Sequence, residues 1–286
     1  MKPTFQHQLL SSFYLWFDSY LMRKGEAYET FTTNFYYYAD ERITDKVVFG
    51  SPYKQFVVDE SIDGAVILEA VSGDGTAISK GTSGMMVDYE NGRLLFDSGF
   101  PTGTNLSGRY SVKNFNTYIS NQNEEQLILE GKYETNSRYT RELTYIKPYD
   151  QVTPAAFLSV EGVNNVPFAL GGEDDSVINA KAVVFAENLY ELDGILSVFA
   201  DSNHTCFANI PFTGAPLNEY GDVKSDHYPS GYNYTGLANN YQNDTYMIDN
   251  TTVSKFSDRA RRVLEPSLYV GFIDFEIHKY RFPRST

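Results

Sequence analysis

A short hairpin sequence constrains the fold of this 286-residue chain more than any other segment. Residues 87–96 read VDYENGRLLF, and apolar and polar side chains alternate on both sides of Asn91-Gly92. Asn-Gly is the preferred pair for a two-residue type I′ turn, because both turn residues need positive φ. Such a turn places Glu90 opposite Arg93, and it gathers four apolar side chains on one buried face: Val87, Tyr89, Leu94 and Phe96. We interpret the stretch as a rigid wall of an antiparallel sheet, with no residue left for catalysis.

The N-terminal segment has a different period. In residues 5–24 the apolar side chains recur at spacings of three and four, which places them on one helical face: Phe5, Leu9, Phe13, Trp16, Phe17, Tyr20 and Leu21. Gly25, directly after Arg23 and Lys24, is a typical helix stop. The pattern predicts an amphipathic helix with an aromatic face. That face either packs against the chain's own β-domain or docks onto a neighbouring subunit.

From residue 30 onward the period changes to two and β-forming residues dominate. We expect a Tyr-rich extended or loop segment at residues 31–40 and two short strands within residues 46–61, broken at Gly50-Ser51-Pro52. Further short strands are expected at residues 64–75, 107–120 and 124–134, in addition to the hairpin, with turn signals between them. Strands of this length and spacing are typical of an antiparallel β-sandwich or a small barrel. The sequence therefore predicts a helical arm at residues 1–30 and an antiparallel β-domain at residues 31–150.

Residues 151–286 indicate a mixed α/β region, so the predicted fold class is mainly β with α. Residues 179–201 begin as an apolar strand and continue with helical spacing, which is half of a βαβ unit. Residues 220–252 are crowded with Asn, Tyr, Asp, Gly and Ser, and we expect a long surface loop there. The chain closes with a strongly alternating strand within residues 264–282.

Charge and composition exclude several classes of protein. A formal net charge of −14 argues against a chain that grips phosphates, because nucleic-acid affinity comes largely from clustered Lys and Arg. We expect no sequence-specific nucleic-acid binding. An acidic surface that lies beside DNA and repels it is an alternative that the charge does not exclude. The apolar stretch at residues 9–22 contains polar side chains and is too short for a bilayer, and no signal peptide is recognisable. Cys206 is the only cysteine, and we interpret it as a small buried side chain.

The common catalytic patterns are missing from the sequence. It has no phosphate-binding Gly-Lys-Ser/Thr loop, no G-x-S-x-G elbow and no closely spaced histidine pair. Acidic residues gather at Glu173, Asp174 and Asp175, and again at Asp222 and Asp226 with His227. Neither group has the spacing of a calcium loop, so we interpret both as solvated turn residues. We therefore predict no catalytic, cofactor-binding or metal-binding residues. The sequence leaves one alternative, a pair of carboxylates that meet in space and cleave glycosides.

Several segments resemble a family of virion structural proteins of long-tailed bacteriophages, including cyanophage-like ones. The resemblance is carried by SSFYLWFDSYLMRKGEAYETFTTNFYYYAD, FGSPYKQFVVDESIDGAVIL, VDYENGRLLF, LSGRYSVKNFNTYISNQNEEQLILEGKY, VPFALGGEDD and AVVFAENLYELDGILSVFAD, and it extends to about residue 212. It implies a non-enzymatic particle component at the neck or tail, as a connector, collar or tail terminator. It also implies other neck, tail or portal-side proteins as partners, and assembly in the host cytoplasm.

A ring of identical subunits needs two different complementary patches on each copy. We predict the N-terminal helix and the loop at residues 220–252 as these patches, with eight candidate interface residues: Phe13, Trp16, Phe17, Tyr20, Tyr228, Tyr232, Tyr234 and Tyr241. The rival prediction is a carbohydrate-binding or carbohydrate-cleaving module of a tail fibre, because aromatic rings and acidic loops also suit sugars. An acidic cytoplasmic enzyme of unknown class is a third possibility.

Overall fold

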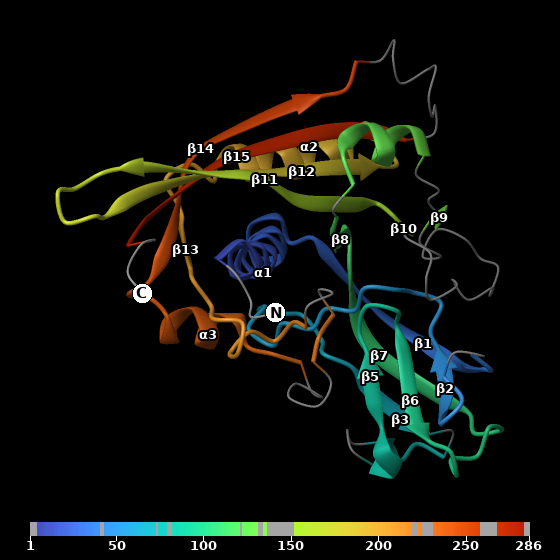
Figure 1. The fold of residues 1–286 in the computed structure, drawn as a ribbon. Helices are drawn as coiled ribbons and strands as arrows, with labels where there is room; N and C mark the ends of the chain where they lie inside the picture. The colour runs from blue at the N-terminus through green and yellow to red at the C-terminus, as the bar shows by residue number, and fades with distance from the viewer. Residues whose placement is uncertain are drawn as a thin grey trace.

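The protein is mainly β, with curled and mostly antiparallel sheets and a long N-terminal helix that lies against the upper sheet (Figure 1). In the computed structural model the described residues are 5–40, 43–72, 74–78, 82–120, 122–130, 134–135, 152–218, 222–224, 231–257 and 268–282. The predicted fold class, mainly β with α, is confirmed. No helix in these ranges is long and apolar enough to cross a membrane.

Seven described strands form the first sheet, in the order β4-β3-β7-β1-β2-β6-β5. Their bounds are β1 Tyr28–Tyr38, β2 Lys46–Gly50, β3 Glu69–Ser72, β4 Ala77–Ile78, β5 Met86–Asp88, β6 Arg93–Asp97 and β7 Leu106–Lys113. Neighbouring strands pair antiparallel throughout. A short 3₁₀ turn, η1, covers Thr82–Gly84. The sheet covers much of the region in which the sequence predicts an antiparallel β-domain.

The second sheet has the order β13-β14-β15-β12-β11-β8. Its strands are β8 Asn116–Ile119, β11 Ala155–Pro167, β12 Asp174–Ala186, β13 Cys206–Ala208, β14 Thr245–Lys255 and β15 Tyr269–Arg281. The alternation predicted for the last strand is confirmed, because four alternate residues of β15 are buried: Gly271, Ile273, Phe275 and Ile277. A separate two-stranded pair joins β9 Glu134–Thr135 and β10 Val152–Thr153.

Within the described ranges, three α-helices accompany the sheets: α1 Phe5–Gly25, α2 Leu189–Ala200 and α3 Tyr234–Asn240. The first helix has the predicted position, but it is buried on most of its surface, including its polar residues Ser11, Ser12, Asp18 and Ser19. The rings of Phe17 in α1 and Phe199 in α2 stack at 4.1 Å, so the two helices pack together against the second sheet. The prediction of an amphipathic arm is therefore wrong in one respect, since the helix is central to the core.

One hydrophobic cluster runs through all three predicted regions. It includes Leu9 of α1, Phe49 of the first sheet and Ile277 of the second. The segment predicted as one strand at residues 107–120 is two strands, because the chain leaves the first sheet after Lys113 and enters the second at Asn116. The predicted boundaries at residues 30 and 150 thus do not separate independent cores.

The hairpin at residues 87–96 exists, but with a longer loop than predicted. Val87 pairs with Leu94 and Asp88 with Arg93, so the strands are joined by four residues, and of these only Gly92 has positive φ. The predicted pairing of Glu90 with Arg93 is wrong. Arg93 instead bonds the carboxylates of Asp88 and Asp40, both at or below 2.8 Å. The observed register differs from the predicted one by two residues. Because side chains alternate with a period of two, a shift of two keeps each side chain on its predicted face, and the apolar face is buried.

Four further predictions are corrected. Residues 220–252 are not one loop, since α3 and most of β14 lie within this range. Residues 124–134, predicted as a strand, include a π-helical turn at Gln126–Glu130. The strand and helix within residues 179–201 are confirmed as β12 and α2, but both described neighbours of β12 run antiparallel to it, so it does not form a βαβ unit with them. Cys206 is exposed.

Candidate functional site

The predicted interface residues of the first helix lie inside the protein. Phe13 and Phe17 have no exposed surface, and Trp16 is 5% exposed. Tyr20 is half-buried, and its hydroxyl donates to the backbone oxygen of Asp201. Phe13, Trp16 and Phe17 are therefore core residues, and the prediction that they contact another subunit is wrong because no partner can reach them.

The second predicted patch is also largely packed against the body. Tyr232 and Tyr234 are buried, Tyr241 is half-buried, and Tyr228 lies outside the described residues. Asp59, which is fully buried, accepts a hydrogen bond from the backbone N–H of Tyr234 at 3.0 Å. This carboxylate holds the start of α3 against the chain segment beside the first sheet. Among the described residues, Phe13, Trp16 and Phe17 of the first patch and Tyr232 and Tyr234 of the second are buried in one body rather than exposed as aromatic faces.

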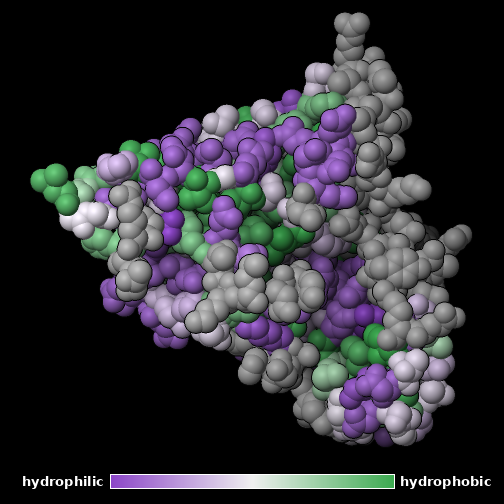
Figure 2. All heavy atoms as spheres, viewed as in Figure 1, coloured by the Kyte–Doolittle hydropathy of each residue, from purple (hydrophilic) through white to green (hydrophobic). Residues whose placement is uncertain are grey.

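The large apolar side chains that are exposed gather elsewhere. Five of the nine in the described part of the chain lie at the turn between β11 and β12 and at the adjacent end of β15: Val166, Phe168, Leu170, Tyr280 and Phe282. We name these five residues the hairpin tip. The turn projects from the body in Figure 1, and its end has hydrophobic colour in Figure 2. A contiguous exposed apolar patch is typical of an interaction surface.

The hairpin tip has a defined shape. The backbone N–H groups of Phe168 and Ala169 both donate to the oxygen of Glu173, and Gly172 donates to Ala169. Gly172 has a φ of +85°, which only glycine adopts readily. The ring of Phe168 lies 4.6 Å from that of Tyr280, so β15 supports the turn from the side. The apolar side chains are therefore presented on a pre-formed loop.

A groove lies near the start of α2. It has a volume of about 480 Å³, and its lining includes Leu21, Ala27, Phe115 and Ile195. We name it the α2 groove. Three small residues, Gly25, Gly194 and Ser197, also line it, and each is exposed. On its rim, Tyr190 is 90% exposed. The groove therefore combines apolar walls with an aromatic rim that solvent reaches.

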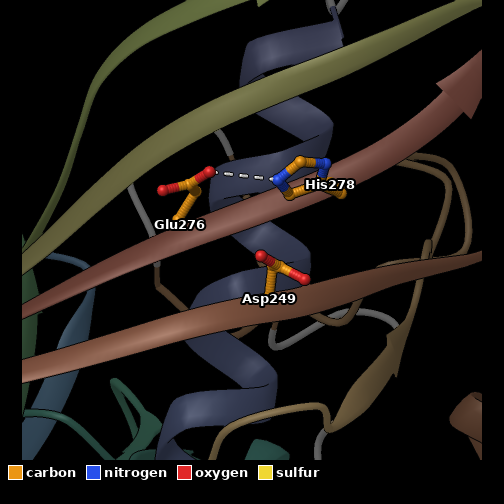
Figure 3. A group of neighbouring side chains, drawn as sticks. All are labelled: Asp249, Glu276 and His278. Carbon is orange, nitrogen blue, oxygen red and sulfur yellow. Dashed lines mark hydrogen bonds and ion pairs between the residues drawn. The ribbon is translucent and has the colours of Figure 1, made fainter. Parts of the chain in front are cut away.

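A third feature is a polar cluster on the outer face of the second sheet, shown in Figure 3. Asp249 comes from β14, and Glu276 and His278 come from β15. Asp249 occupies a register irregularity between Ile248 and Asn250. Nε2 of His278 lies 3.2 Å from Glu276, and Nδ1 lies 2.8 Å from Asp175 of β12. Carboxylates thus engage both ring nitrogens.

This arrangement favours a protonated His278. Partial burial lowers the pKa of the imidazole, but the hydrogen bonds to Asp175 and Glu276 outweigh burial and raise it above its ordinary value. Oxygen and nitrogen atoms of Asp249, Glu276 and His278 lie within 4.8 Å of one another, a spacing that suits a cation. A metal ion would have to displace the ring proton first. The cluster is therefore best understood as an ion-pair network that joins three strands.

A pair of carboxyl groups lies in a cavity of about 360 Å³ beside the β5–β6 hairpin. Burial raises the pKa of Glu90 well above its ordinary value, and a hydrogen bond to Asp222 raises it further. Glycoside hydrolases hold their two carboxyls at least about 5 Å apart, with the sugar between them. Since Glu90 and Asp222 are hydrogen-bonded to each other, this pair does not match that arrangement. The predicted loop residues Asp226 and His227 lie outside the described residues.

Sequence reasoning missed the features that lie on the surface. The hairpin tip has a signal, since residues 166–172 read VPFALGG and carry no charge between two strands. The Glu276-x-His278 spacing also predicts two side chains on one strand face. The acids of the GGEDDS stretch are structural rather than solvated, because Asp174 is buried and Asp175 binds His278.

Comparison with known proteins adds no relative. No protein-family model matches the chain, and no curated protein matches it at significant similarity.

Proposed function

We propose that this chain is a non-enzymatic structural component of a tailed bacteriophage particle. It belongs to the neck or tail, as a connector, collar or tail-terminator subunit, and it assembles as a ring with other virion proteins as neighbours. The segment resemblance supports this class of particle. The pre-formed surfaces of the fold support a role in contact between subunits.

The observation that carries this proposal is the exposed hairpin tip. Leu170 is fully exposed and Phe168 is 61% exposed, although each would gain about 1.5–3 kcal/mol from complete burial. An exposed apolar patch at the end of a projecting hairpin is typical of a surface that binds another molecule. An assembly subunit uses it to bind its neighbour, with little change of shape because the turn is already ordered.

The titratable groups have structural partners that fit the same role. Asp40 and Asp88 hold Arg93 at the hairpin, and Asp175 and Glu276 hold His278 across the second sheet. Such networks fix the relative positions of strands. A subunit under mechanical load between head and tail benefits from this rigidity.

Quantitative mass spectrometry of purified particles of the phage that encodes this chain tests the proposal. We expect the chain in every particle preparation, at a fixed copy number relative to the portal protein that corresponds to whole rings. If the chain is missing from purified particles but abundant in infected cells, the proposal is wrong.

The rival carbohydrate module has lost part of its basis. Tyr232 and Tyr234 are buried, so their rings are not accessible for stacking on a sugar. Binding of a host surface polysaccharide by the isolated chain, abolished by substitution of one exposed aromatic residue, would favour the rival over the structural role.

A further inference from the structure

We propose that the hairpin tip of one copy docks into the α2 groove of a second copy, so that subunits associate head to tail. This inference deepens the proposed function and rests on it, because it names the partner of the exposed tip. The occupant of the groove is the apolar turn around Phe168 and Leu170.

The two surfaces lie at opposite ends of one strand. The hairpin tip precedes β12, which begins at Asp174, and α2 begins at Leu189, just after β12 ends at Ala186. A strand of 13 residues spans roughly 40 Å at about 3.3 Å per residue. One rigid element therefore fixes the distance and direction between them. Two different patches at opposite ends of a subunit form heterologous contacts, which close into rings when the rotation permits.

The surfaces also match in shape and polarity. The tip is convex, and between residues 166 and 172 it carries no charge. The α2 groove is hollow because Gly25, Gly194 and Ser197 leave space between larger apolar side chains. A side chain at Gly194 would meet nothing within 4 Å in the isolated chain, so the space above this residue is open to a partner. Tyr190 stands at the rim, where it can cover an inserted turn.

The groove has an acidic rim formed by Glu29, Glu191 and Asp193, and Asp193 is paired with Lys255. Beside the tip lie Glu173 and Arg281, whose guanidinium bonds Ser176 and Asn165. We expect the remaining donors of Arg281, rather than Glu173, to face the acidic rim of the second copy. A second copy fits better than an unrelated partner, since the same chain carries both the convex and the hollow surface.

Disulfide trapping tests the contact directly. In a Cys206→Ser background, one protein carries Leu170→Cys and a second carries Gly194→Cys. After oxidation of an equal mixture we expect a covalent mixed dimer on a non-reducing gel, and only monomer from either protein alone. A matched control replaces Leu170→Cys with Asn179→Cys, which is exposed on β12 of the same hairpin, seven residues beyond Gly172, and should give little cross-link.

Sedimentation analysis of the full chain measures the affinity. Leu170→Asp should weaken self-association about tenfold or more, because the buried apolar contact becomes a desolvated charge. Asn179→Asp adds the same charge on β12 of the same hairpin, outside the tip, and should change little. Gly194→Leu fills the groove and should weaken association similarly, while it raises helix propensity and so keeps the fold.

The outcomes separate this inference from the proposed function. A tip-to-tip dimer from Leu170→Cys alone, or normal association of both Leu170→Asp and Gly194→Leu, overturns the docking inference even when the chain is present in particles. Absence of the mixed cross-link in both solution and purified particles overturns it as well. Absence of the chain from particles overturns the proposed function, whereas the cross-link would still establish the contact.

Discussion

A buried ion pair allows the packing of the N-terminal helix to be tested. Nζ of Lys113, at the end of β7, lies 2.7 Å from Oδ1 of Asp18 in α1, and both side chains are at most 4% exposed. The same carboxylate oxygen accepts a hydrogen bond from Thr117 of β8 at 3.0 Å. The pair thus joins the helix to both sheets. We predict that Asp18→Asn, which keeps the shape but removes the charge, destabilises the fold because the buried ammonium group of Lys113 loses the carboxylate of Asp18.

The expected cost is about 3–5 kcal/mol, the usual penalty for removing one partner of a buried pair. This is a large part of the 5–15 kcal/mol that stabilises a typical domain. Lys113→Met should cost a similar amount, because it leaves the carboxylate unpaired. The double variant should recover much of the loss, since neither charge then remains buried.

Urea denaturation followed by circular dichroism measures all four proteins at pH 7. The midpoints should change while the slopes stay equal, so that the shifts report stability. A loss below about 1 kcal/mol in both single variants, or additive losses in the double variant, would show that the two charges are solvated. In that case the helix does not lie in the core as described.

Three other substitutions test the packing, the turn and the buried acid described above. Phe17→Ala should lower the free energy of unfolding, measured by urea denaturation, by about 3–5 kcal/mol because the ring is fully buried. Unchanged stability would contradict its burial in the core. Gly92→Ala should cost about 2 kcal/mol or more, since φ is +63° and the new Cβ would meet the Tyr53 oxygen, whereas Gly103→Ala should change little; equal melting temperatures would refute this. Glu90 holds its proton more tightly in the folded state, so stability should fall as pH rises from about 4.3 through its raised pKa. Glu90→Gln should remove that fall in thermal melts, and an unchanged profile would contradict it.

Elements with a regular period could be predicted from sequence. The alternation from Tyr269 to Ile277 identified β15, and the spacing from Phe5 to Leu21 identified α1. The burial of α1 could not be predicted, because Ser12 and Asp18 look like members of a solvated face. Their partners, Ile210 and Lys113, are about 200 and 95 residues away in the chain.

The length of the hairpin loop at residues 87–96 and the lining of the α2 groove could not be predicted, because both depend on contacts between distant parts of the chain. Asn91-Gly92 favours a two-residue turn, but the segment before the hairpin bonds its loop, with Gln55 donating to Glu90 and Ser51 to Gly92. These bonds select the longer loop. The α2 groove combines residues 21–29, 114–115 and 190–198, so no local pattern indicates it. The hairpin tip had a local signal, namely an uncharged apolar turn.

The central position of α1 affects how a cell makes this protein. Phe13 and Phe17 leave the ribosome first, whereas Phe275, which their rings contact, is synthesised about 250 residues later. At roughly 5–20 residues per second, the aromatic helix waits on the order of 13–50 s for this partner. We expect it to be a binding site for chaperones during that interval. When the last strand has been synthesised, we expect the helix to leave the chaperone and pack into the core. A truncated chain that lacks this strand should stay bound to chaperones and should not assemble.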